Sequence, residues 1–364
     1  MKERTIHPEF RLNGVSYTTV TLQEQAYCFI KEGAAYEEHI GDFLLDWLST
    51  SLTITVQTSG STGTPKQLVI KKEHMVNSAL ATGIFFELEP GNTVLHCLAT
   101  EFIAGKMMLV RALVLGLDII CVAPVSNPLG ATNAKFDFAA MVPLQLRNSI
   151  AKIHHLKMLL VGGAPFSDDL KELVQDKPTN IYETYGMTET ITHIALKRIN
   201  HLKNIETDQE SNVFKVLPEV SITMDNRDCL VINASSISDT EVVTNDVVRM
   251  ISETEFEWLG RYDNVINSGG VKLFPERIEA KLTKIVAQRF FVAGLPDEKL
   301  GRKLVLFVEG KSDIGNSLGT IAGAAFLDKF EIPKDVIFVA NFKETKNGKI
   351  NRKTTLQSVI GYGA

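Results

Sequence analysis

A run of hydroxyl and glycine residues near the start of the chain has the composition of a phosphate-binding loop. It reads Thr58-Ser-Gly-Ser-Thr-Gly-Thr-Pro-Lys66. Its glycines let backbone N–H groups turn toward one anion, its hydroxyls add donors, and its lysine adds a full positive charge. The residues expected to bind phosphate are Thr58, Ser59, Gly60, Ser61, Thr62, Gly63 and Lys66.

This loop differs from the P-loop of kinases and GTPases. In that motif the sequence GxxxxGK is followed by Ser or Thr, whose hydroxyl holds magnesium. Here Pro65 stands in place of the second glycine, and Gln67 follows Lys66. A flexible Ser/Thr/Gly linker is the alternative interpretation, although such a linker rarely ends in Pro-Lys between two strands.

Further polar segments follow along the chain, and each of them alone also fits an ordinary turn or a solvated loop. They are Gly162-Gly-Ala-Pro165, Tyr182-Glu-Thr-Tyr-Gly-Met-Thr-Glu-Thr190, Thr244-Asn-Asp246, Gly260-Arg-Tyr-Asp263, Ser268-Gly-Gly-Val-Lys-Leu-Phe-Pro-Glu276 and Asn347-Gly-Lys349-Ile-Asn-Arg-Lys353. Their types and order are more informative than any single one of them.

Together with the loop at 58–66, these segments resemble the motifs of the ANL superfamily. That superfamily contains acyl-CoA synthetases, the adenylation domains of peptide synthetases and luciferases. The matching segments span residues 58–349, which is most of the chain. The resemblance implies an enzyme that uses ATP, Mg²⁺ and CoA to activate a small carboxylic acid through an acyl-adenylate.

The resemblance also implies roles at the nucleotide. In the segment that ends at Thr190, Thr188 would contact the α-phosphate region, Glu189 would hold the magnesium ion, and Tyr185 would lie at the nucleotide. Gly163 and Ala164 would lie along the adenine, where a glycine turn lets a flat ring approach the backbone.

The next two motifs would bind the ribose and form a hinge. Asp246 would accept hydrogen bonds from the ribose hydroxyls, and Arg261 would reach the ribose and phosphate. Asn245 stands where the family usually has glycine, and Asn tolerates a positive φ better than most residues. Asp263 would be the hinge, followed by Asn264 where the family often has a second Asp.

The last motifs would belong to a part of the chain that moves. Lys349 would be the catalytic lysine that bridges the substrate carboxylate and the α-phosphate. When CoA attacks the acyl-adenylate in the second half-reaction, Gly269 and Gly270 would take the place of Lys349 and line the CoA tunnel.

Within the superfamily the chain resembles the compact o-succinylbenzoate–CoA ligases of bacterial menaquinone synthesis. The phosphate loop comes after only 57 residues, so the large domain is expected to be shortened at its N-terminus. The segments that support this likeness are Phe43–Trp47, Ile103–Met108, Met141–Gln145 and Met187–Ala195.

An acid with two carboxylates needs a cation for the carboxylate that is not activated. Lys106 and Arg111 lie in an otherwise apolar segment and are candidates, although Arg111 could equally reach out of the core to water. His193 is a candidate for the acyl pocket, and a structural histidine is the alternative. Phe102 stands where relatives often carry a histidine before the Ala-Gly step.

Two other functions remain open at the level of sequence. One is adenylation of an aryl or amino acid for transfer to a carrier protein. The other is adenylate binding without catalysis, which the retention of Lys66, Glu189, Asp246, Arg261 and Lys349 disfavours.

The elements that position these motifs alternate between strand and helix up to about residue 174. We expect strands at 52–57 and 67–71 on either side of the phosphate loop, and a helix at 36–48 before them. Two further helices are expected after the loop, at about 73–86 and 103–116. The alternation predicts an α/β fold with a largely parallel sheet, followed at 213–258 by a β-rich subdomain of antiparallel strands.

A small, mobile α+β domain is expected to complete the chain. Its first helix should begin at Pro275, because proline suits the first helical position, and another helix is expected at about 320–329. We therefore predict a large adenylate-forming domain at 1–261, with the ATP and acid sites, and a small C-terminal domain at 262–364.

Composition restricts the partners. The 364 residues are 45% apolar and 22% charged, with a net charge of −5 and no Lys/Arg block, so a role in nucleic-acid binding is not expected. Four separated cysteines and the lack of a signal peptide favour the cytoplasm. The apolar stretch 107–125 is interrupted by Arg111 and predicts a buried helix followed by a strand rather than a membrane span. The sequence does not indicate an oligomeric state.

Overall fold

The fold was obtained as a computed structural model. It describes residues 6–57, 67–130, 132–164, 166–201, 212–310, 317–344 and 350–360. None of the helices in these ranges is long and apolar enough to cross a membrane.

Strands and helices alternate through the first half of the chain, as the sequence predicts. In chain order the elements are β1 (Arg11–Leu12), β2 (Val15–Ser16), α1 (Thr19–Glu32), α2 (Ala35–Leu48), β3 (Thr53–Gln57), β4 (Gln67–Lys71), α3 (Lys72–Phe86), β5 (Thr93–His96), α4 (Ile103–Leu115), β6 (Asp118–Cys121), β7 (Phe136–Met141), α5 (Pro143–Ser149), β8 (Leu156–Val161), α6 (Asp168–Val174) and β9 (Asn180–Gly186).

The central part of the main sheet is parallel and carries helices on both faces. The strands follow the order β1-β6-β5-β7-β8-β9, and each neighbouring pair in this order is parallel. Side chains alternate between the faces, so that Phe138 packs in the core that contains α1 to α4, whereas Ala139 packs in the core that contains α5 and α6.

The β-rich run continues the same sheet in antiparallel fashion. Its strands are β10 (His193–Arg198), β11 (Val213–Val216), β12 (Ser221–Met224), β13 (Cys229–Asn233), β14 (Val242–Met250) and β15 (Glu255–Arg261). They extend the sheet from β9 in the order β10-β11-β15-β14-β13-β12, which gives 13 strands among the described residues. The predicted antiparallel region is thus joined to the parallel one through β9.

The two strands that flank the phosphate loop form a separate hairpin. Among the described strands, β3 and β4 pair only with each other, antiparallel and in register from Thr53↔Lys71 to Gln57↔Gln67. Ile54, Val56 and Ile70 are buried in the main core and hold the hairpin against it. The predicted strand–loop–strand arrangement is confirmed at its two ends, and residues 58–66 lie outside the described ranges.

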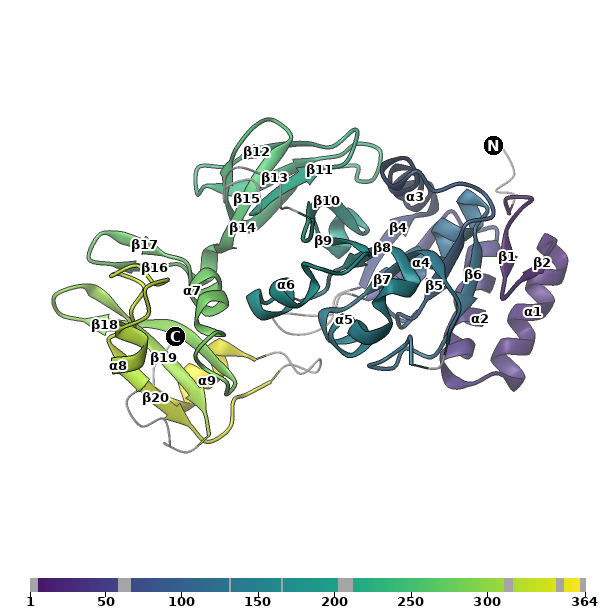
Figure 1. Cartoon of the computed structure of the whole chain (residues 1–364). Helices are drawn as coiled ribbons and strands as arrows, with labels where there is room; N and C mark the ends of the chain where they lie inside the picture. Colours follow the sequence, from purple (N-terminus) through teal and green to yellow (C-terminus); the bar gives the residue numbers. More distant parts are fainter. Residues whose placement is uncertain are drawn as a thin grey trace.

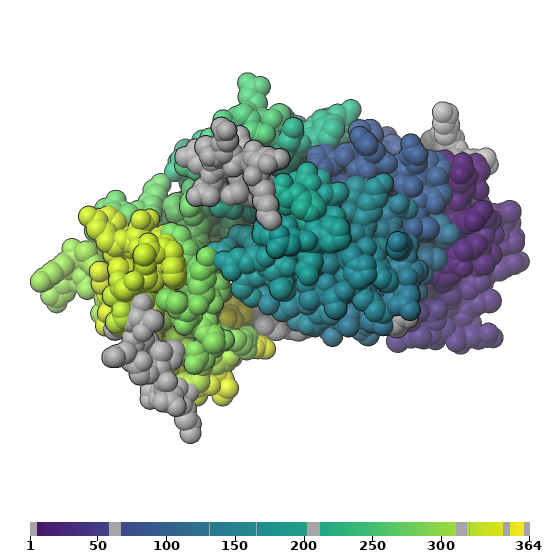
Figure 2. Space-filling model, viewed as in Figure 1, coloured from purple at the N-terminus to yellow at the C-terminus, as the bar shows by residue number. Residues whose placement is uncertain are grey.

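The C-terminal part forms a second sheet. Its elements are β16 (Ile266–Ser268), β17 (Val271–Leu273), α7 (Pro275–Leu282), β18 (Phe290–Asp297), β19 (Gly301–Glu309), α8 (Ser317–Ala322), β20 (Asp335–Val339) and α9 (Arg352–Ile360). In Figure 1 this sheet lies to the left of the main one, with α7 between them. Figure 2 shows the same order along the molecule, from the purple N-terminal helices at one end to the green and yellow C-terminal elements at the other.

Two helices of the fold were not predicted from the sequence. α1 was not predicted, although Leu22, Ala26 and Phe29 have helical spacing and are buried, and Thr18 caps the helix by accepting from the Thr21 N–H. α9 was also not predicted, and the helix expected at about 320–329 is observed as α8 at Ser317–Ala322.

Candidate active site

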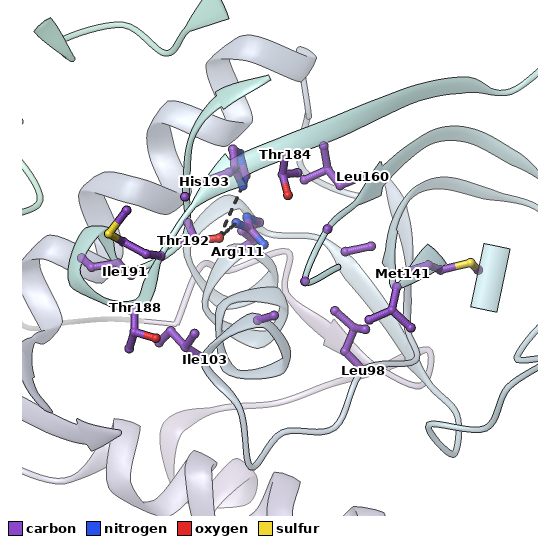
Figure 3. Close-up of a pocket in the computed structure, with 17 residues that line it drawn as sticks. Leu98, Ile103, Arg111, Met141, Leu160, Thr184, Thr188, Ile191, Thr192 and His193 are labelled. Carbon is purple, nitrogen blue, oxygen red and sulfur yellow. Dashed lines mark hydrogen bonds between the residues drawn. The ribbon is translucent and has the colours of Figure 1, made fainter. Parts of the chain in front are cut away.

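A pocket of about 210 Å³ opens where the parallel strands end. It lies beyond the carboxyl ends of β5, β7, β8 and β9, which is where α/β sheets bind ligands. Figure 3 shows side chains from α4 and from the turn after β9 that face this space. The lining residues are Leu98, Ile103, Ala104, Arg111, Ala140, Met141, Val142, Leu160, Gly162, Gly163, Thr184, Gly186, Met187, Thr188, Ile191, Thr192 and His193.

Arg111 supplies the positive charge of this largely apolar pocket. It projects from α4 and is only 2% exposed, so the alternative in which it reaches out to water is wrong. Its Nε donates to Thr82 Oγ1 at 3.3 Å and its Nη2 donates to Thr192 Oγ1 at 3.3 Å. Burial lowers the pKa of Arg111 to about 10, so the guanidinium stays charged near neutral pH. No ion pair within the described ranges involves it.

His193 lies beside this arginine, as Figure 3 shows. Its Nε2 is 3.4 Å from Thr82 Oγ1 and its Nδ1 is 3.4 Å from Thr192 Oγ1. Burial first, and the charge of Arg111 second, hold the pKa of His193 well below its usual range. The imidazole is therefore neutral at physiological pH.

The glycine turn after β8 forms another wall of the pocket. A Cβ at Gly162 would lie 2.1 Å from Thr184 Oγ1, so a side chain there would force the Thr184 side chain on β9 to move. Gly163 has a φ of +81°, a conformation that favours glycine. This geometry fits the predicted close approach of a flat ring at Gly163 and Ala164.

The turn after β9 brings Thr188 to the pocket. Thr188 lines it from a short 3-10 segment (Thr188–Thr190), and the carboxylate of the next residue, Glu189, is exposed to solvent. An exposed carboxylate beside a candidate phosphate position has the oxygen chemistry that Mg²⁺ prefers.

A second polar cluster lies on the other side of β9. The Tyr185 hydroxyl donates to Asp246 Oδ2 at 2.8 Å, Trp258 Nε1 donates to Asp246 Oδ1 at 3.1 Å, and Arg261 Nη1 is 3.5 Å from the same Oδ1. Asp246 is 4% exposed. Burial first, and Asp246 second, raise the pKa of Tyr185 above its usual range, so Tyr185 stays a donor. The structure thus brings together three residues that the sequence analysis assigned to the nucleotide.

The predicted hinge lies at the end of this cluster. Asp263 is exposed and accepts a hydrogen bond from Asn245 Nδ2 at 3.1 Å, while Asn245 Oδ1 accepts one from Arg227 at 2.9 Å. Asn245 therefore bridges Arg227 and Asp263, which the glycine usual at this position could not do.

Gly269 and Gly270 form the turn between β16 and β17. Their φ values are +56° and +84°, which glycine adopts readily.

Several predicted site residues are not brought to the pocket. The Lys106 ammonium lies over the Phe43 ring, 5.2 Å from its centroid, and Phe102 is 47% exposed at the start of α4. Burial lowers the pKa of Lys106. The phosphate-binding residues Thr58, Ser59, Gly60, Ser61, Thr62, Gly63 and Lys66, together with Lys349, lie outside the described residues.

Other site residues were not identified from the sequence. Thr82 and Thr192 hold Arg111, and Trp258 holds Asp246. The available signals were weak: Thr82 is one of several polar residues in α3, and Trp258 lies shortly before Gly260 and Arg261 on the same strand.

Comparison with known proteins agrees with this geometry. A family model described as AMP-binding enzyme matches residues 48–230. The 2-succinylbenzoate–CoA ligase of Listeria monocytogenes serovar 1/2a is 24% identical over 331 residues, covering 85% of this chain and 71% of that protein. The enzyme of the same name from Geobacillus sp. is 23% identical over 363 residues, covering 91% of this chain and 74% of that protein.

Solved structures show the same fold. An acyl-CoA synthetase (AMP-forming)/AMP-acid ligase II-like protein from Dyadobacter fermentans is 34% identical, with a TM-score of 0.60 and coverage of 92% of this chain and 98% of that one. The o-succinylbenzoate CoA synthetase of Bacillus subtilis, in complex with the acyl-adenylate intermediate OSB-AMP, is 17% identical, with a TM-score of 0.73 and coverage of 94% and 81%. The family model covers half of the chain and the Dyadobacter protein aligns over nearly its whole length, so this chain belongs to the AMP-binding enzyme family.

Proposed function

We propose that this enzyme is an AMP-forming acid–CoA ligase whose acid carries a second carboxylate, and that the acid is o-succinylbenzoate. One observation carries the proposal: Arg111 is a buried, charged arginine at the pocket wall with no carboxylate partner among the described residues. A buried charge without a counter-charge is costly in a protein that gains nothing from it.

The surroundings of Arg111 fit such an acid. Leu98, Ile103 and Leu160 provide apolar walls for an aromatic ring, and the guanidinium provides the partner for a carboxylate attached to that ring. o-Succinylbenzoate has one carboxylate on its ring and one on its side chain. The relatives from Listeria and Geobacillus bear the name of this activity, which supports the choice.

The reaction proceeds in two steps. An oxygen of the acid's carboxylate attacks the α-phosphorus of ATP, a new P–O bond forms, and pyrophosphate leaves. The sulfur of CoA then attacks the acyl carbon, the thiol gives up its proton, and AMP leaves with the electron pair of the broken C–O bond.

Residues from two regions would position the nucleotide. Asp246 and Arg261 would hold the ribose, Gly163 and Ala164 the adenine, and Thr188 the α-phosphate. The loop from Thr58 to Lys66 would hold the other phosphates.

Glu189 would hold Mg²⁺, which when bound screens the charge of the phosphates. Lys349 would stabilise the charge that develops between acid and α-phosphate.

We further propose that the chain works as two domains, residues 1–261 and 262–364, which turn about Asp263 between the steps. The turn at Gly269–Gly270 would then line the path of CoA. ATP and CoA are cytoplasmic metabolites, so we place the reaction in the cytoplasm, with small molecules as partners and no nucleic acid.

Pyrophosphate release across a panel of acids, with and without CoA, tests the proposal. We expect release with o-succinylbenzoate and formation of its CoA thioester. An absence of stimulation by o-succinylbenzoate would exclude this acid, and acylation of a phosphopantetheinylated protein in place of CoA would favour the carrier-protein alternative.

The variant Arg111→Met tests the arginine itself. We expect it to lower kcat/KM for o-succinylbenzoate by about a hundredfold, because it removes a charged hydrogen-bond partner from a buried site. Arg147→Met is the matched control, since Arg147 is surface-exposed and paired with Asp169. Equal losses in both variants would contradict the assignment.

A further inference from the structure

We infer that Thr82, Thr192 and His193 are positioning residues that hold the Arg111 guanidinium through neutral groups only, with His193 carrying its proton on Nε2. This inference rests on the proposed function, because it explains how Arg111 keeps its charge and its orientation for the acid's second carboxylate. It also gives a role to Thr82, Thr192 and His193, which take no direct part in the proposed reaction.

The tautomer follows from counting protons around Thr82. A threonine hydroxyl has one proton, and that of Thr82 donates to the Ser78 carbonyl oxygen at 3.0 Å. The oxygen then accepts from Arg111 Nε at 3.3 Å, and it can only accept from His193 Nε2 at 3.4 Å. His193 Nε2 is therefore the protonated nitrogen.

The other side of the imidazole completes a ring of contacts. With its proton on Nε2, a neutral imidazole has a bare Nδ1, which accepts from the Thr192 hydroxyl at 3.4 Å. The oxygen of that hydroxyl accepts in turn from Arg111 Nη2 at 3.3 Å. Each donor thus meets an acceptor around the ring Arg111–Thr82–His193–Thr192, and the ring contains no negative charge.

Because Thr82, Thr192 and His193 are all neutral, the positive charge of Arg111 remains available to a ligand. A carboxylate in place of His193 would pair with Arg111 and fill the position that the substrate needs. A protonated imidazole would repel the guanidinium, and burial together with Arg111 keeps the pKa of His193 well below its usual range.

The arginine also has donors left over. Of its five N–H groups, Nε contacts Thr82, one on Nη2 contacts Thr192, and one on Nη1 contacts Met108 Sδ at 3.6 Å. One N–H on each terminal nitrogen has no partner among the described residues. These two donors are the number that a two-point contact with one carboxylate requires.

Kinetics with altered hydroxyls test the inference. We expect Thr82→Val and Thr192→Val each to raise the KM for o-succinylbenzoate by about tenfold, with kcat changed much less, because each leaves the arginine without one orienting acceptor. Thr82→Ser and Thr192→Ser keep the hydroxyl and should retain a KM near that of the wild type. Thr179→Val is the control, since the Thr179 hydroxyl is also buried but donates to the Ile153 carbonyl oxygen, outside the pocket.

The comparison of acids makes the test specific. Two analogues, each lacking one carboxylate of o-succinylbenzoate, are assayed alongside it, and the analogue that is still activated should have the same KM in wild type and valine variants. In an Arg111→Met background the valine substitutions should have no further effect. The inference would be overturned if the valine substitutions raised the KM for the analogue as much as the KM for o-succinylbenzoate. It would also be overturned if their effects added to that of Arg111→Met.

Nitrogen-15 NMR of the histidine side chains tests the ring without any substrate. We expect His193 to show the Nε2–H tautomer and no titration from about pH 5.5 to about pH 8. A proton on Nδ1, or a titration within that range, would overturn the inference. If the wild type activates no acid, the proposed function fails, while the NMR signals still decide whether the ring exists.

Discussion

Buried histidines occur away from the pocket as well. His96, at the end of β5, is 1% exposed, and its Nε2 lies 2.9 Å from Thr100 Oγ1. Its Nδ1 has no hydrogen-bond partner among the described residues. Burial lowers the pKa of His96 from 6.5 to about 4. The folded protein therefore holds this imidazole neutral under conditions in which the unfolded chain protonates it.

This difference predicts a loss of stability in mild acid. Between the two pKa values the unfolded state binds more protons, so the free energy of unfolding falls as the pH is lowered. We expect His96 to contribute a loss of about 2 kcal/mol between about pH 7.5 and about pH 5, measured by urea unfolding. His96→Gln should flatten the pH profile by this amount, and His154→Gln, at an exposed position, should not. The same slope in His96→Gln as in the wild type would contradict the prediction.

The sequence indicated that Arg111 is unusual but did not reveal the residues that contact it. A charged residue in an apolar helix was visible as an anomaly, and the resemblance to the ANL superfamily implied that Thr188 and Gly163 contact the same nucleotide. The partners of Arg111 were not visible, because Thr82 is 29 residues away and Thr192 is 81 residues away. Contacts over such separations are set by how α3, α4 and the turn after β9 pack, and no local pattern specifies that packing.

Among the elements, α4 illustrates how closely a helix can be fitted to the chain that precedes it. A Cβ at Gly105 would lie 2.4 Å from the Ala99 carbonyl oxygen and 2.9 Å from Thr100 Cα. Both atoms belong to the backbone and cannot turn away. The glycine of the Ala-Gly step is therefore what lets α4 begin close beneath the pocket.

We expect Gly105→Ala to lower the free energy of unfolding by about 1–3 kcal/mol, the usual cost of overpacking a buried site. Gly319→Ala in α8 is the matched control, because a Cβ there meets nothing within 4 Å and alanine is the better helix former. Chemical denaturation of both variants measures the difference. If Gly105→Ala were as stable as Gly319→Ala, the close approach at Ala99 would have to be relieved by a shift of the helix.

Elements with strong periodic patterns were predicted well from the sequence, and those without were not. The hairpin β3–β4, the helices α2 to α4 and the proline-initiated α7 occur where they were expected. α1 was not predicted because its first turn carries Thr19, Val20 and Thr21, β-branched residues that resemble a strand. In the fold, the cap at Thr18 and the packing of α1 on α2 outweigh this preference.

In the whole molecule, the two sheets meet through charged side chains. Lys272 in β17 is 3.0 Å from Asp228, Arg277 in α7 is 3.5 Å from Glu257, and Lys284 is 3.4 Å from Glu172. Glu257 is 4% exposed, so its pair with Arg277 is partly buried, whereas the pairs of Lys272 and Lys284 are exposed and contribute about 0–1 kcal/mol each. Such contacts hold one arrangement of the sheets only weakly, as the proposed rotation about Asp263 requires.

We therefore expect the distance between the sheets to respond to charge. Spin labels at two exposed positions, Glu24 in α1 and Glu298 after β18, would report it in a background that carries Cys28→Ser. Asp228→Lys should broaden the distance distribution because it places two positive charges together. The swapped pair Asp228→Lys with Lys272→Asp should restore it. An unchanged distribution in the single variant would show that this ion pair does not help to hold the sheets.

β9 has a further consequence for how this enzyme could change over evolutionary time. Thr184 and Gly186 face the pocket, while Tyr185 between them points to Asp246 on the opposite face. An insertion or deletion of one residue in this strand would exchange the two faces and disrupt both clusters at once. New acid preferences can therefore arise far more readily through substitutions at the positions of α4 that line the pocket, which do not contact the Asp246 cluster, than through any change in the strand that both clusters share.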